Sequence, residues 1–381
     1  MLFAYVGSFS YKGQGGVHIC RYEEETGAFS LLESAYPEIN AGFVCVRGDL
    51  LYATDERAGD PKGFPGDAGG GRIYTFRIDR ETGGLTLLAV TPTLGVNPSH
   101  VVFDPTGRYA VVTHFSIGPM VTRTVRKEGG GFAAEIVTND SITCLFRLNE
   151  DGTPGRLCDV FWHKDGHGPF SMIHKAYRFP GKNLFAENDL GADILYFFSI
   201  DYEGEKLIYR NSYALSDHGA GPRHGVVHPE LPYLYINYER MGAVSRYDVS
   251  DLDQIHKEED ANFVPDGMEL DRRRDNQSEL MFGPDGKTLY SFLRGKGYAI
   301  VYDVDGKTGA LTQRQFLKLP GSDPRGAVFS PDHRFILIAG HEAGELETLR
   351  VLEDGTLEDT GLRTELNDPA CIAFYTGGKD K

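Results

Sequence analysis

The sequence predicts an all-β protein, a seven-bladed β-propeller of four-stranded antiparallel blades, and three observations carry this prediction. A hairpin-like pattern recurs along the chain at spacings of roughly 50 residues, and a period of this size is typical of repeat architectures. A second pattern falls between its copies and supplies the other two strands of each blade. An unmatched strand-like segment stands at each end of the chain.

The first pattern is a β-branched or aromatic run, an acidic-Gly turn and a second run, as in RIYTFRIDRETGGLTLL. Asp-Gly and similar steps favour tight hairpin turns, so each copy predicts two antiparallel strands. One copy, AVSRYDVSDLDQI, is degenerate. The seven copies begin at Gly16, Arg72, Thr143, Ile194, Ala243, Ala299 and Thr348.

The second pattern consists of small or apolar residues, a Pro/Gly turn and an aromatic-rich run. Its examples are HVVFDPTGRYAVV, HGVVHPELPYLYI, LMFGPDGKTLYSF and GAVFSPDHRFILI, which begin at His100, His224, Leu280 and Gly326. Pro-Asp-Gly steps also form turns, so this pattern predicts a second hairpin in each unit.

The ends of the chain predict how the ring closes. Residues 371–375 read as an inner strand with no partner pattern after it, and residues 2–6 read as an unpaired first strand. We expect the two to share one blade. No Pro/Gly/Ser linker divides the sequence into halves, so residues 1–381 are expected to form a single propeller domain.

Three segments depart from the repeat. Residues 57–71 are rich in Gly, Pro and Asp but lack the GxxxxGK[ST] pattern, so we expect a flexible loop and not a phosphate cradle. Residues 120–140 predict a hairpin extended around glycines 129–131. Residues 256–275 carry charges of both signs, which favours a solvated loop.

Composition limits the partners and the compartment. The 39 basic and 55 acidic residues leave a formal charge of −16, which opposes nucleic acid binding. No stretch approaches the roughly 20 apolar residues of a membrane span, and the segment MLFAYVGSFSYKG reads as a strand and not as a signal peptide. The five scattered cysteines favour free thiols and a reducing compartment. We expect a cytoplasmic monomer or homodimer that binds a small molecule.

Polar residues recur at one level of the predicted blades. The innermost strand of each propeller blade lines the central channel, so the residues just before the second pattern and at the end of its second strand should face that channel. The first group contains Asn40, Asn97, His100, His174, Arg223, His224, Gln277, Ser278, Arg325 and Asn367, and the second contains Asp55, Glu56, His114, Asn188, Asp189, Glu239, Arg294 and His341.

Each of these residues taken alone fits a solvated rim or a turn cap. Together, three arginines and several histidines with few carboxylates would be a costly arrangement for stability alone, because unpaired buried charge is unfavourable. The set therefore favours an anionic ligand or a developing oxyanion.

The segment GAGPRHGVVHPELPYLYINYE, residues 219–239, carries a family resemblance. Supporting segments cover almost the whole chain: YVGSF, NPSHVVFDPTGRYAVV, NDLGADILYFF, FGPDGKTLYSFLRG, DPRGAVFSPDHRFILIAG and DPACIAF. In these the chain resembles the bacterial seven-bladed lactonase family, which includes the propeller-type 6-phosphogluconolactonases and the fungal 3-carboxy-cis,cis-muconate cyclase.

By position, the resemblance implies a catalytic arginine at Arg223, a catalytic glutamate at Glu239 and a further site arginine at Arg294. Where the family shows a PHxHS-like step, this chain reads GHGPFSMIHKAYRFPGK. His174 is the nearest candidate for the catalytic histidine, with His167 behind it. The remaining expected substrate-binding residues are His100, His114, His224, Arg325 and Asp189.

Hydrolysis of a lactone needs a base for water, a group for the oxyanion and a proton for the leaving ring oxygen. Glu239 would be the base, the arginines would hold the oxyanion or a substrate anion, and His174 or His224 would donate the proton. No metal or other cofactor is expected. A calcium site remains a minor alternative, with ligands from Asp55, Glu56, Asn188 and Asp189.

Three classes of function therefore compete. The leading one is a lactonase for a sugar lactone, such as 6-phosphogluconolactone or a related aldonolactone. The second is a cycloisomerase or lyase that acts on a cyclic or unsaturated carboxylic acid at the same site. The third is a non-catalytic propeller that binds a protein, but the single tryptophan, Trp162, does not belong to a Trp-Asp blade signature.

Overall fold

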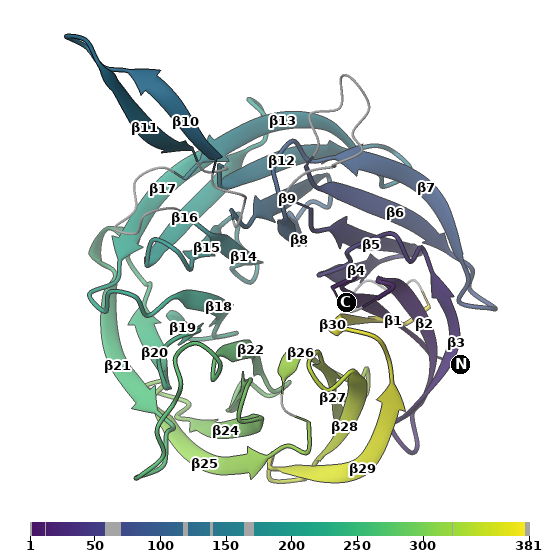
Figure 1. Cartoon of the computed structure of the whole chain (residues 1–381). Coiled ribbons are helices and arrows are strands. Elements are labelled where there is room, and N and C mark those ends of the chain that lie inside the picture. Colours follow the sequence, from purple (N-terminus) through teal and green to yellow (C-terminus); the bar gives the residue numbers. More distant parts are fainter. Residues whose placement is uncertain are drawn as a thin grey trace.

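In the computed structural model, seven four-stranded antiparallel sheets stand around a central axis as the blades of a propeller (Figure 1), which confirms the predicted fold. The structure describes residues 2–11, 13–57, 70–116, 121–137, 140–163, 171–321 and 323–377. Most of the loop expected at 57–71 lies outside the described residues, as does His167.

From the innermost strand outward, blade 1 consists of β30 (Pro369–Tyr375), β1 (Leu2–Ser8), β2 (Gly16–Glu23) and β3 (Ala28–Ala35). Blade 2 is β4 (Val44–Arg47), β5 (Leu50–Asp55), β6 (Arg72–Ile78) and β7 (Leu85–Pro92), and blade 3 is β8 (Pro98–Phe103), β9 (Tyr109–His114), β12 (Ile142–Leu148) and β13 (Pro154–Trp162). Blade 4 is β14 (Ile173–Arg178), β15 (Phe185–Asp189), β16 (Ile194–Asp201) and β17 (Lys206–Ala214), and blade 5 is β18 (Pro222–Val227), β19 (Tyr233–Tyr238), β20 (Ala243–Asp248) and β21 (His256–Asn262). Blade 6 is β22 (Gln277–Phe282), β23 (Thr288–Leu293), β24 (Tyr298–Val304) and β25 (Leu311–Lys318), and blade 7 is β26 (Pro324–Phe329), β27 (Phe335–Gly340), β28 (Glu345–Val351) and β29 (Leu357–Glu365).

The ring closes within blade 1, as the two ends of the sequence predicted. Strand β30 pairs with β1 from Phe3 and Tyr375 to Ser8 and Pro369, and β1 pairs with β2 on its other side. Closure between the first and last strands leaves no open blade at the chain ends, and exposed sheet edges are the usual route to unwanted pairing.

The recurring acidic-Gly turns also join neighbouring blades. In four places a buried or nearly buried tyrosine on the second strand of one blade donates a hydrogen bond to the carbonyl of a turn glycine in the next blade. The pairs are Tyr5 and Gly83 (2.8 Å), Tyr52 and Gly152 (2.8 Å), Tyr235 and Gly309 (2.6 Å), and Tyr290 and Gly355 (2.8 Å). The first sequence pattern therefore supplies both the outer hairpin and a contact between blades.

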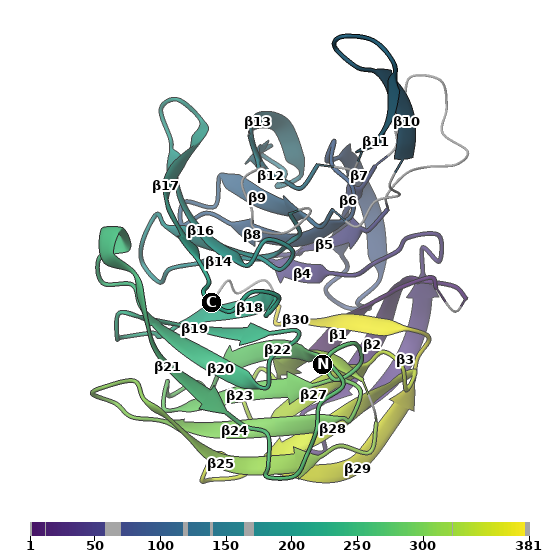
Figure 2. The same cartoon turned by 60° about the vertical axis from the view of Figure 1, so that its left-hand side comes forward.

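Apolar side chains fill the space between adjacent blades. One such layer contains Phe3, Tyr5 and Leu51 and lies between blades 1 and 2, and a second contains Tyr235, Leu289 and Tyr302 and lies between blades 5 and 6. Blade-to-blade packing of this kind holds the inner strands in place around the axis. The turned view shows the neighbouring blades side by side (Figure 2).

Residues 256–275 differ from the expected solvated loop. The segment His256–Asn262 forms β21, the outer strand of blade 5, and its residues alternate between exposed and partly buried. The sequence did not reveal this strand, because both faces of an outermost strand are partly solvated. Charged residues are therefore tolerated on both faces, and the usual alternation of polar and apolar residues is absent. The degenerate repeat copy thus continues into this strand after a short 3₁₀ turn, Leu252–Gln254.

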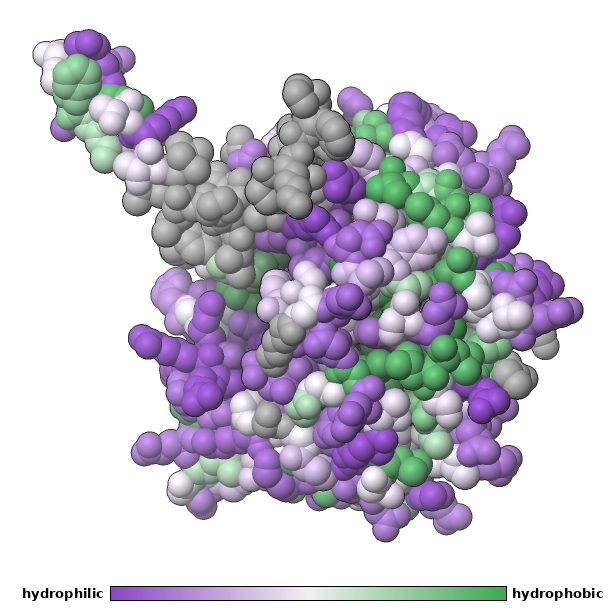
Figure 3. Space-filling model, turned by 45° about the vertical axis from the view of Figure 1, so that its right-hand side comes forward, coloured by the Kyte–Doolittle hydropathy of each residue, from purple (hydrophilic) through white to green (hydrophobic). Residues whose placement is uncertain are grey.

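The extension expected at 120–140 is a two-stranded hairpin of its own. Strands β10 (Val121–Arg126) and β11 (Phe132–Val137) pair only with each other and project from blade 3 (Figure 1). Among the described residues, no helix has both the length and the apolar character to cross a membrane. The face in Figure 3 is mainly hydrophilic, with smaller apolar patches.

Candidate active site

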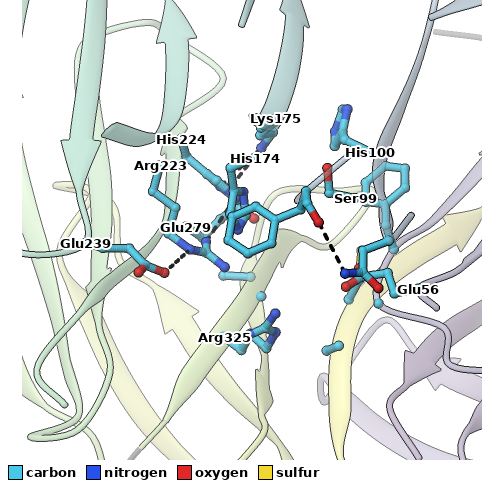
Figure 4. Close-up of a pocket in the computed structure, with 18 of the residues that line it drawn as sticks. Glu56, Ser99, His100, His174, Lys175, Arg223, His224, Glu239, Glu279 and Arg325 are labelled. Atoms are coloured by element: carbon cyan, nitrogen blue, oxygen red, sulfur yellow. Dashed lines mark hydrogen bonds and ion pairs between the residues drawn. The ribbon is translucent and has the colours of Figure 1, made fainter. Parts of the chain in front are cut away.

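A cavity of about 490 Å³ opens at the centre of the ring, where the inner strands of the blades meet. Figure 4 shows charged side chains that point into it from several blades. The lining includes eight residues of the predicted set, namely Glu56, Asn97, His100, His174, Arg223, His224, Glu239 and Arg325. The structure therefore brings together residues that lie far apart in the sequence.

A recurring backbone irregularity aims these side chains at the cavity. On six of the seven innermost strands, one extra residue interrupts the pairing with the second strand, and β4 alone pairs regularly. A bulge turns a side chain out of the regular alternation and is common beside active sites. The residues at these bulges are Ser99, His174, Arg223 with His224, Ser278 with Glu279, Arg325, and Ala370.

Glu239 lies between two arginines at one side of the cavity. Its Oε1 is 2.8 Å from a terminal nitrogen of Arg294 and 3.3 Å from Nε of Arg223. Its Oε2 has no hydrogen-bond partner among the described residues. Arg294 does not line the main cavity but an adjoining pocket, which shares Arg325 with it.

The electrostatic setting keeps Glu239 ionised. Burial raises the pKa of the Glu239 carboxyl, but three neighbouring guanidinium groups outweigh this effect and hold the pKa below its ordinary value. Those groups belong to Arg294, Arg223 and Arg325. Burial and the other two arginines lower the pKa of Arg223 to about 9, so it remains a cation at neutral pH.

Arg223 is held by hydrogen bonds that also determine the tautomer of His224. A terminal nitrogen of Arg223 donates to the carbonyl of Ser278 at 2.8 Å and to Nε2 of His224 at 3.0 Å. Since Nε2 accepts, the ring proton of neutral His224 is on Nδ1, which lies 2.7 Å from Oε1 of Glu279. Lys175 donates to the same oxygen at 3.0 Å. His224 thus connects the partly buried ion pair of Lys175 and Glu279 to the arginine beside Glu239.

The histidines of the cavity are neutral at physiological pH. Burial, followed by the charge of Arg223, lowers the pKa of His174 well below its ordinary value. Burial and Lys175 do the same for His224, and burial lowers the pKa of His100 to about 3. The rings of His174 and His224 lie 5.1 Å apart, and Nδ1 of His174 is buried without a described partner.

Arg325 is the cation whose donors are uncommitted. No hydrogen bond or ion pair joins its guanidinium to any described residue, and its Cζ lies 4.6 Å from the centre of the Phe9 ring. Burial and Arg294 lower its pKa. A cation that is held on an aromatic face but not paired with a carboxylate can receive an anionic group.

Besides Arg294, two expected substrate-binding residues lie outside the lining of the cavity. His114 is fully buried, with Nδ1 3.0 Å from the carbonyl of Ile142. Asp189 accepts hydrogen bonds from the backbone N–H groups of Met172 and Ala192. Both positions fit a structural role in their blades, at the strand ends that the sequence pattern correctly located.

Sequence reasoning missed Lys175, Glu279 and Ser99 as residues of the lining. A proline at the start of an inner strand could have indicated some of these positions. Four of the bulged strands begin with a proline that directly precedes a bulge residue: Pro98, Pro222, Pro324 and Pro369. Proline suits a strand start because it has no N–H for the ladder. Lys175 and Glu279 follow no such step, and only their contact across blades identifies them.

The residues considered for calcium do not gather. Asp55 accepts the Asn40 N–H at 2.8 Å and pairs with Arg57 at 2.8 Å, while Asp189 caps its own turn. In the described parts of the chain, the groups close enough to share an ion are Asp248 with His256 and Glu258, and Asp323 with His341 and Glu342. Neither contains a residue of the calcium alternative.

The fold and the cavity define a β-propeller of the enzyme type, with a charged central site in place of a flat binding face. A model of the family described as "Lactonase, 7-bladed beta-propeller" matches residues 3–374. The chain therefore belongs to this family, as its sequence resemblance indicated.

Curated relatives span the full length of the chain. It is 24% identical to the 6-phosphogluconolactonase of Formosa agariphila over 388 residues, which cover 98% of this chain and 99% of that protein. It is also 24% identical to the 6-phosphogluconolactonase of Bacillus subtilis, with 97% of each chain covered.

Solved structures share the fold. The periplasmic gluconolactonase of Pseudomonas aeruginosa matches with a TM-score of 0.81 at 20% identity, over 98% of this chain and 99% of that one. A putative 6-phosphogluconolactonase from Bacteroides fragilis matches with a TM-score of 0.79 at 20% identity, over 98% of each chain.

Proposed function

We propose that this protein hydrolyses a sugar lactone, with 6-phosphogluconolactone or a related aldonolactone as the substrate. The observation that carries the proposal is the Glu239 carboxylate, which lies between Arg223 and Arg294 beside the cavity of a lactonase-family propeller. The names of the curated relatives support the same class of substrate. A volume of about 490 Å³ also falls within the range of small-molecule sites.

In the proposed reaction, Glu239 activates the attacking water. Both arginines approach Oε1, so Oε2 is free to accept a hydrogen bond from water. Ion pairing lowers the basicity of this carboxylate but also keeps it charged and oriented, and orientation contributes strongly to general base catalysis. His174 and His224 are neutral and therefore suit hydrogen bonding to substrate hydroxyl groups or to water better than proton donation.

The arginines supply positive charge for the oxyanion and for an anionic substituent. Arg294 lowers the pKa of both Arg223 and Arg325, so the three cations lie close together, and Glu239 forms an ion pair with Arg223 and with Arg294. Arg325 faces the cavity with its donors uncommitted. We assign it to the substrate's anionic group or to the developing oxyanion, where fixed donors stabilise the transition state.

The test is acid release from a panel of aldonolactones, with and without a 6-phosphate, followed by a pH indicator. The wild-type protein should hydrolyse at least one of them, and Arg223→Ala should reduce kcat/KM by about 100-fold or more. Arg350→Ala, at a half-exposed outer position, is the matched control and should retain activity. Failure of wild type across the panel would contradict the proposal and favour a cycloisomerase, in which the site acts on an unsaturated or cyclic acid without net hydrolysis.

A further inference from the structure

Glu56 places a second carboxylate in the same cavity, on the side opposite Glu239, with Arg325 between them (Figure 4). It directly follows β5, and its backbone is tied down on both sides. Its N–H donates to the carbonyl of Asn40 at 2.9 Å, and the Asn40 side chain donates to the Glu56 carbonyl at 2.6 Å. The backbone is thus fixed, while no described residue forms a hydrogen bond or ion pair with the carboxylate.

Gly42 makes room for this carboxylate. A Cβ atom added to Gly42 would lie 1.8 Å from Oε1 of Glu56, which no real structure tolerates. Any side chain at position 42 would therefore displace the Glu56 carboxylate. The Glu56 carboxylate therefore lies directly against the backbone of Gly42 in the cavity wall.

The two carboxylates differ in their electrostatic setting. Burial raises the pKa of Glu56 to about 7, and this effect exceeds the opposing influence of Arg325 and Arg223. The groups that face Glu56 are these two arginines, Asp55 on its own strand and Tyr11 from the neighbouring loop. Glu239, in contrast, has its pKa lowered by its arginines.

The proposed hydrolysis still needs a group that donates a proton to the leaving ring oxygen. The leaving group is an aliphatic alkoxide, which is strongly basic. Its conjugate acid is an alcohol, and water, the simplest O–H acid of this kind, has a pKa of about 15.7. His174, His224 and His100 are neutral in the cavity and would have to form an imidazolate to donate. Glu239 is ionised and has no proton to give.

We propose that Glu56 is a further catalytic residue, the general acid that protonates the ring oxygen of the lactone as it leaves; this inference rests on the proposed lactone hydrolysis. Water adds to the carbonyl carbon and passes its proton to Glu239. The bond between that carbon and the ring oxygen then breaks, and the carboxylic proton of Glu56 goes to the oxygen, which becomes a hydroxyl group. Glu239 returns its proton to solvent and Glu56 takes one back, so lactone and water give the hydroxy acid.

The decisive experiment compares leaving groups in Glu56→Gln, with Glu38→Gln as the matched control on an exposed neighbouring glutamate. The substrates are an aldonolactone that the wild type cleaves and dihydrocoumarin, whose phenolic leaving group has a pKa of about 10 and needs little acid assistance. Glu56→Gln should lose about 100-fold or more in kcat on the aldonolactone but only a few-fold on dihydrocoumarin. Equal losses on both substrates, or no loss on the aldonolactone, would overturn the assignment.

A pH profile on the aldonolactone provides a second readout that needs no second substrate. For the wild type, kcat/KM should fall as pH rises through about 7, because Glu56 loses its proton there, and this limb should be absent in Glu56→Gln. A limb that persists in the variant would assign the proton to another group and overturn the proposal.

Gly42→Ala tests the position of the carboxylate without changing its chemistry. It should reproduce the leaving-group selectivity of Glu56→Gln, whereas Gly306→Ala, where an added Cβ meets nothing within 4 Å, should behave as wild type. A Gly42→Ala protein that is folded and fully active on the aldonolactone would count against the proposal. If the wild type cleaves no lactone, both the proposed function and the role of Glu56 are refuted. If the wild type is active but Glu56→Gln loses the same factor in kcat on both substrates, only the role of Glu56 is refuted.

Discussion

Two buried polar clusters in this propeller use the same kinds of residue in different ways. In the wall of the ring, Thr143 donates to Glu187 at 2.8 Å, and Nε2 of His163 lies 3.0 Å from the Thr143 hydroxyl and 3.3 Å from Glu187. This wall cluster is buried, and its contacts run through Oε2 of Glu187, while Oε1 of Glu187 and Nδ1 of His163 have no hydrogen-bond partner among the described residues. In the central cavity, the carboxylate of Glu56 and the guanidinium of Arg325 have no hydrogen-bond partner among the described residues, and both residues line the open space.

The difference shows that residue type alone does not identify a catalytic group. A glutamate and a histidine in contact can stabilise a blade or serve a reaction, depending on whether their polar atoms are directed at each other or at a cavity. Unpaired charge is costly for folding. The Glu56 carboxylate in the cavity has no described side-chain partner, whereas the Glu187 carboxylate contacts Thr143 and His163 through Oε2. Exchanging residues in one cluster at a time should therefore separate activity from stability.

The largest effect is expected for Glu239→Gln, which removes the proposed base and keeps the shape of the side chain. The kcat for the cleaved lactone should fall by about 100- to 10,000-fold, while the melting temperature should fall less than for a variant of the wall cluster, since Glu239 borders a cavity and not the core. Kinetics and thermal unfolding on the same preparation check this. Near-normal turnover would remove Glu239 from the mechanism.

The converse is expected for Glu187→Gln in the wall cluster. Loss of one member of a buried charged group should cost about 3 kcal/mol of unfolding free energy, while kcat stays close to that of wild type. Urea unfolding monitored by fluorescence, together with the lactone assay, measures both. A large loss of kcat in a variant of unchanged stability would show that the two clusters are coupled.

Acid should destabilise the protein through its buried histidines. Burial lowers the pKa of His114 to about 4, and the pKa values of His100, His174 and His224 are lowered as well. As pH falls below about 6.5, the unfolded chain binds protons that the folded chain excludes. Each histidine can then remove up to about 1.4 kcal/mol of stability per pH unit.

The melting temperature should accordingly drop between pH 7 and pH 5, and His114→Gln should reduce that drop by about a sixth, because burial also lowers the pKa of His18 and of His228. His114 suits this test because it lies outside the cavity. The lactone activity of the variant should therefore stay close to that of the wild type. A melting temperature that does not change over this interval would contradict the buried neutral state.

A smaller effect is expected for Arg294→Lys. Lysine keeps the positive charge near Glu239 but loses the planar fork of donors, so kcat/KM should fall by about 10-fold, and the pKa of Glu239 should remain low. The acidic limb of the pH profile measures the latter. An increase of that apparent pKa would show that the guanidinium geometry, and not the charge alone, holds Glu239 ionised.

The smallest effect is expected for the hairpin β10–β11. Replacing residues 121–137 with a short Gly/Ser linker should leave both kcat and stability nearly unchanged, because this hairpin forms no ladder with a blade. The lactone assay and thermal unfolding check this. A marked loss of activity would assign the hairpin a part in the site that neither the sequence nor its pairing indicates.

The sequence by itself determined the propeller, the number of blades and the closure within blade 1. Turns such as Asp-Gly, and the alternation of apolar residues along strands, act over a few residues and repeat in phase, so they can be read locally. The same reasoning located Arg223, Glu239 and Arg325 at one level of the ring. It failed for β21, where charges on a doubly solvated outer strand mask the alternation.

Only the tertiary structure decided which polar residues face the cavity and in what state of charge. A bulge on an inner strand turns His174 inward, while His114, at an equally regular position in the sequence pattern, is buried in its blade. Likewise, Glu56 and Glu239 are indistinguishable as strand-end glutamates, yet burial dominates the pKa of Glu56, while arginines, two of them from other blades, dominate the pKa of Glu239. Desolvation and long-range charge depend on neighbours that the chain brings together only when the ring closes.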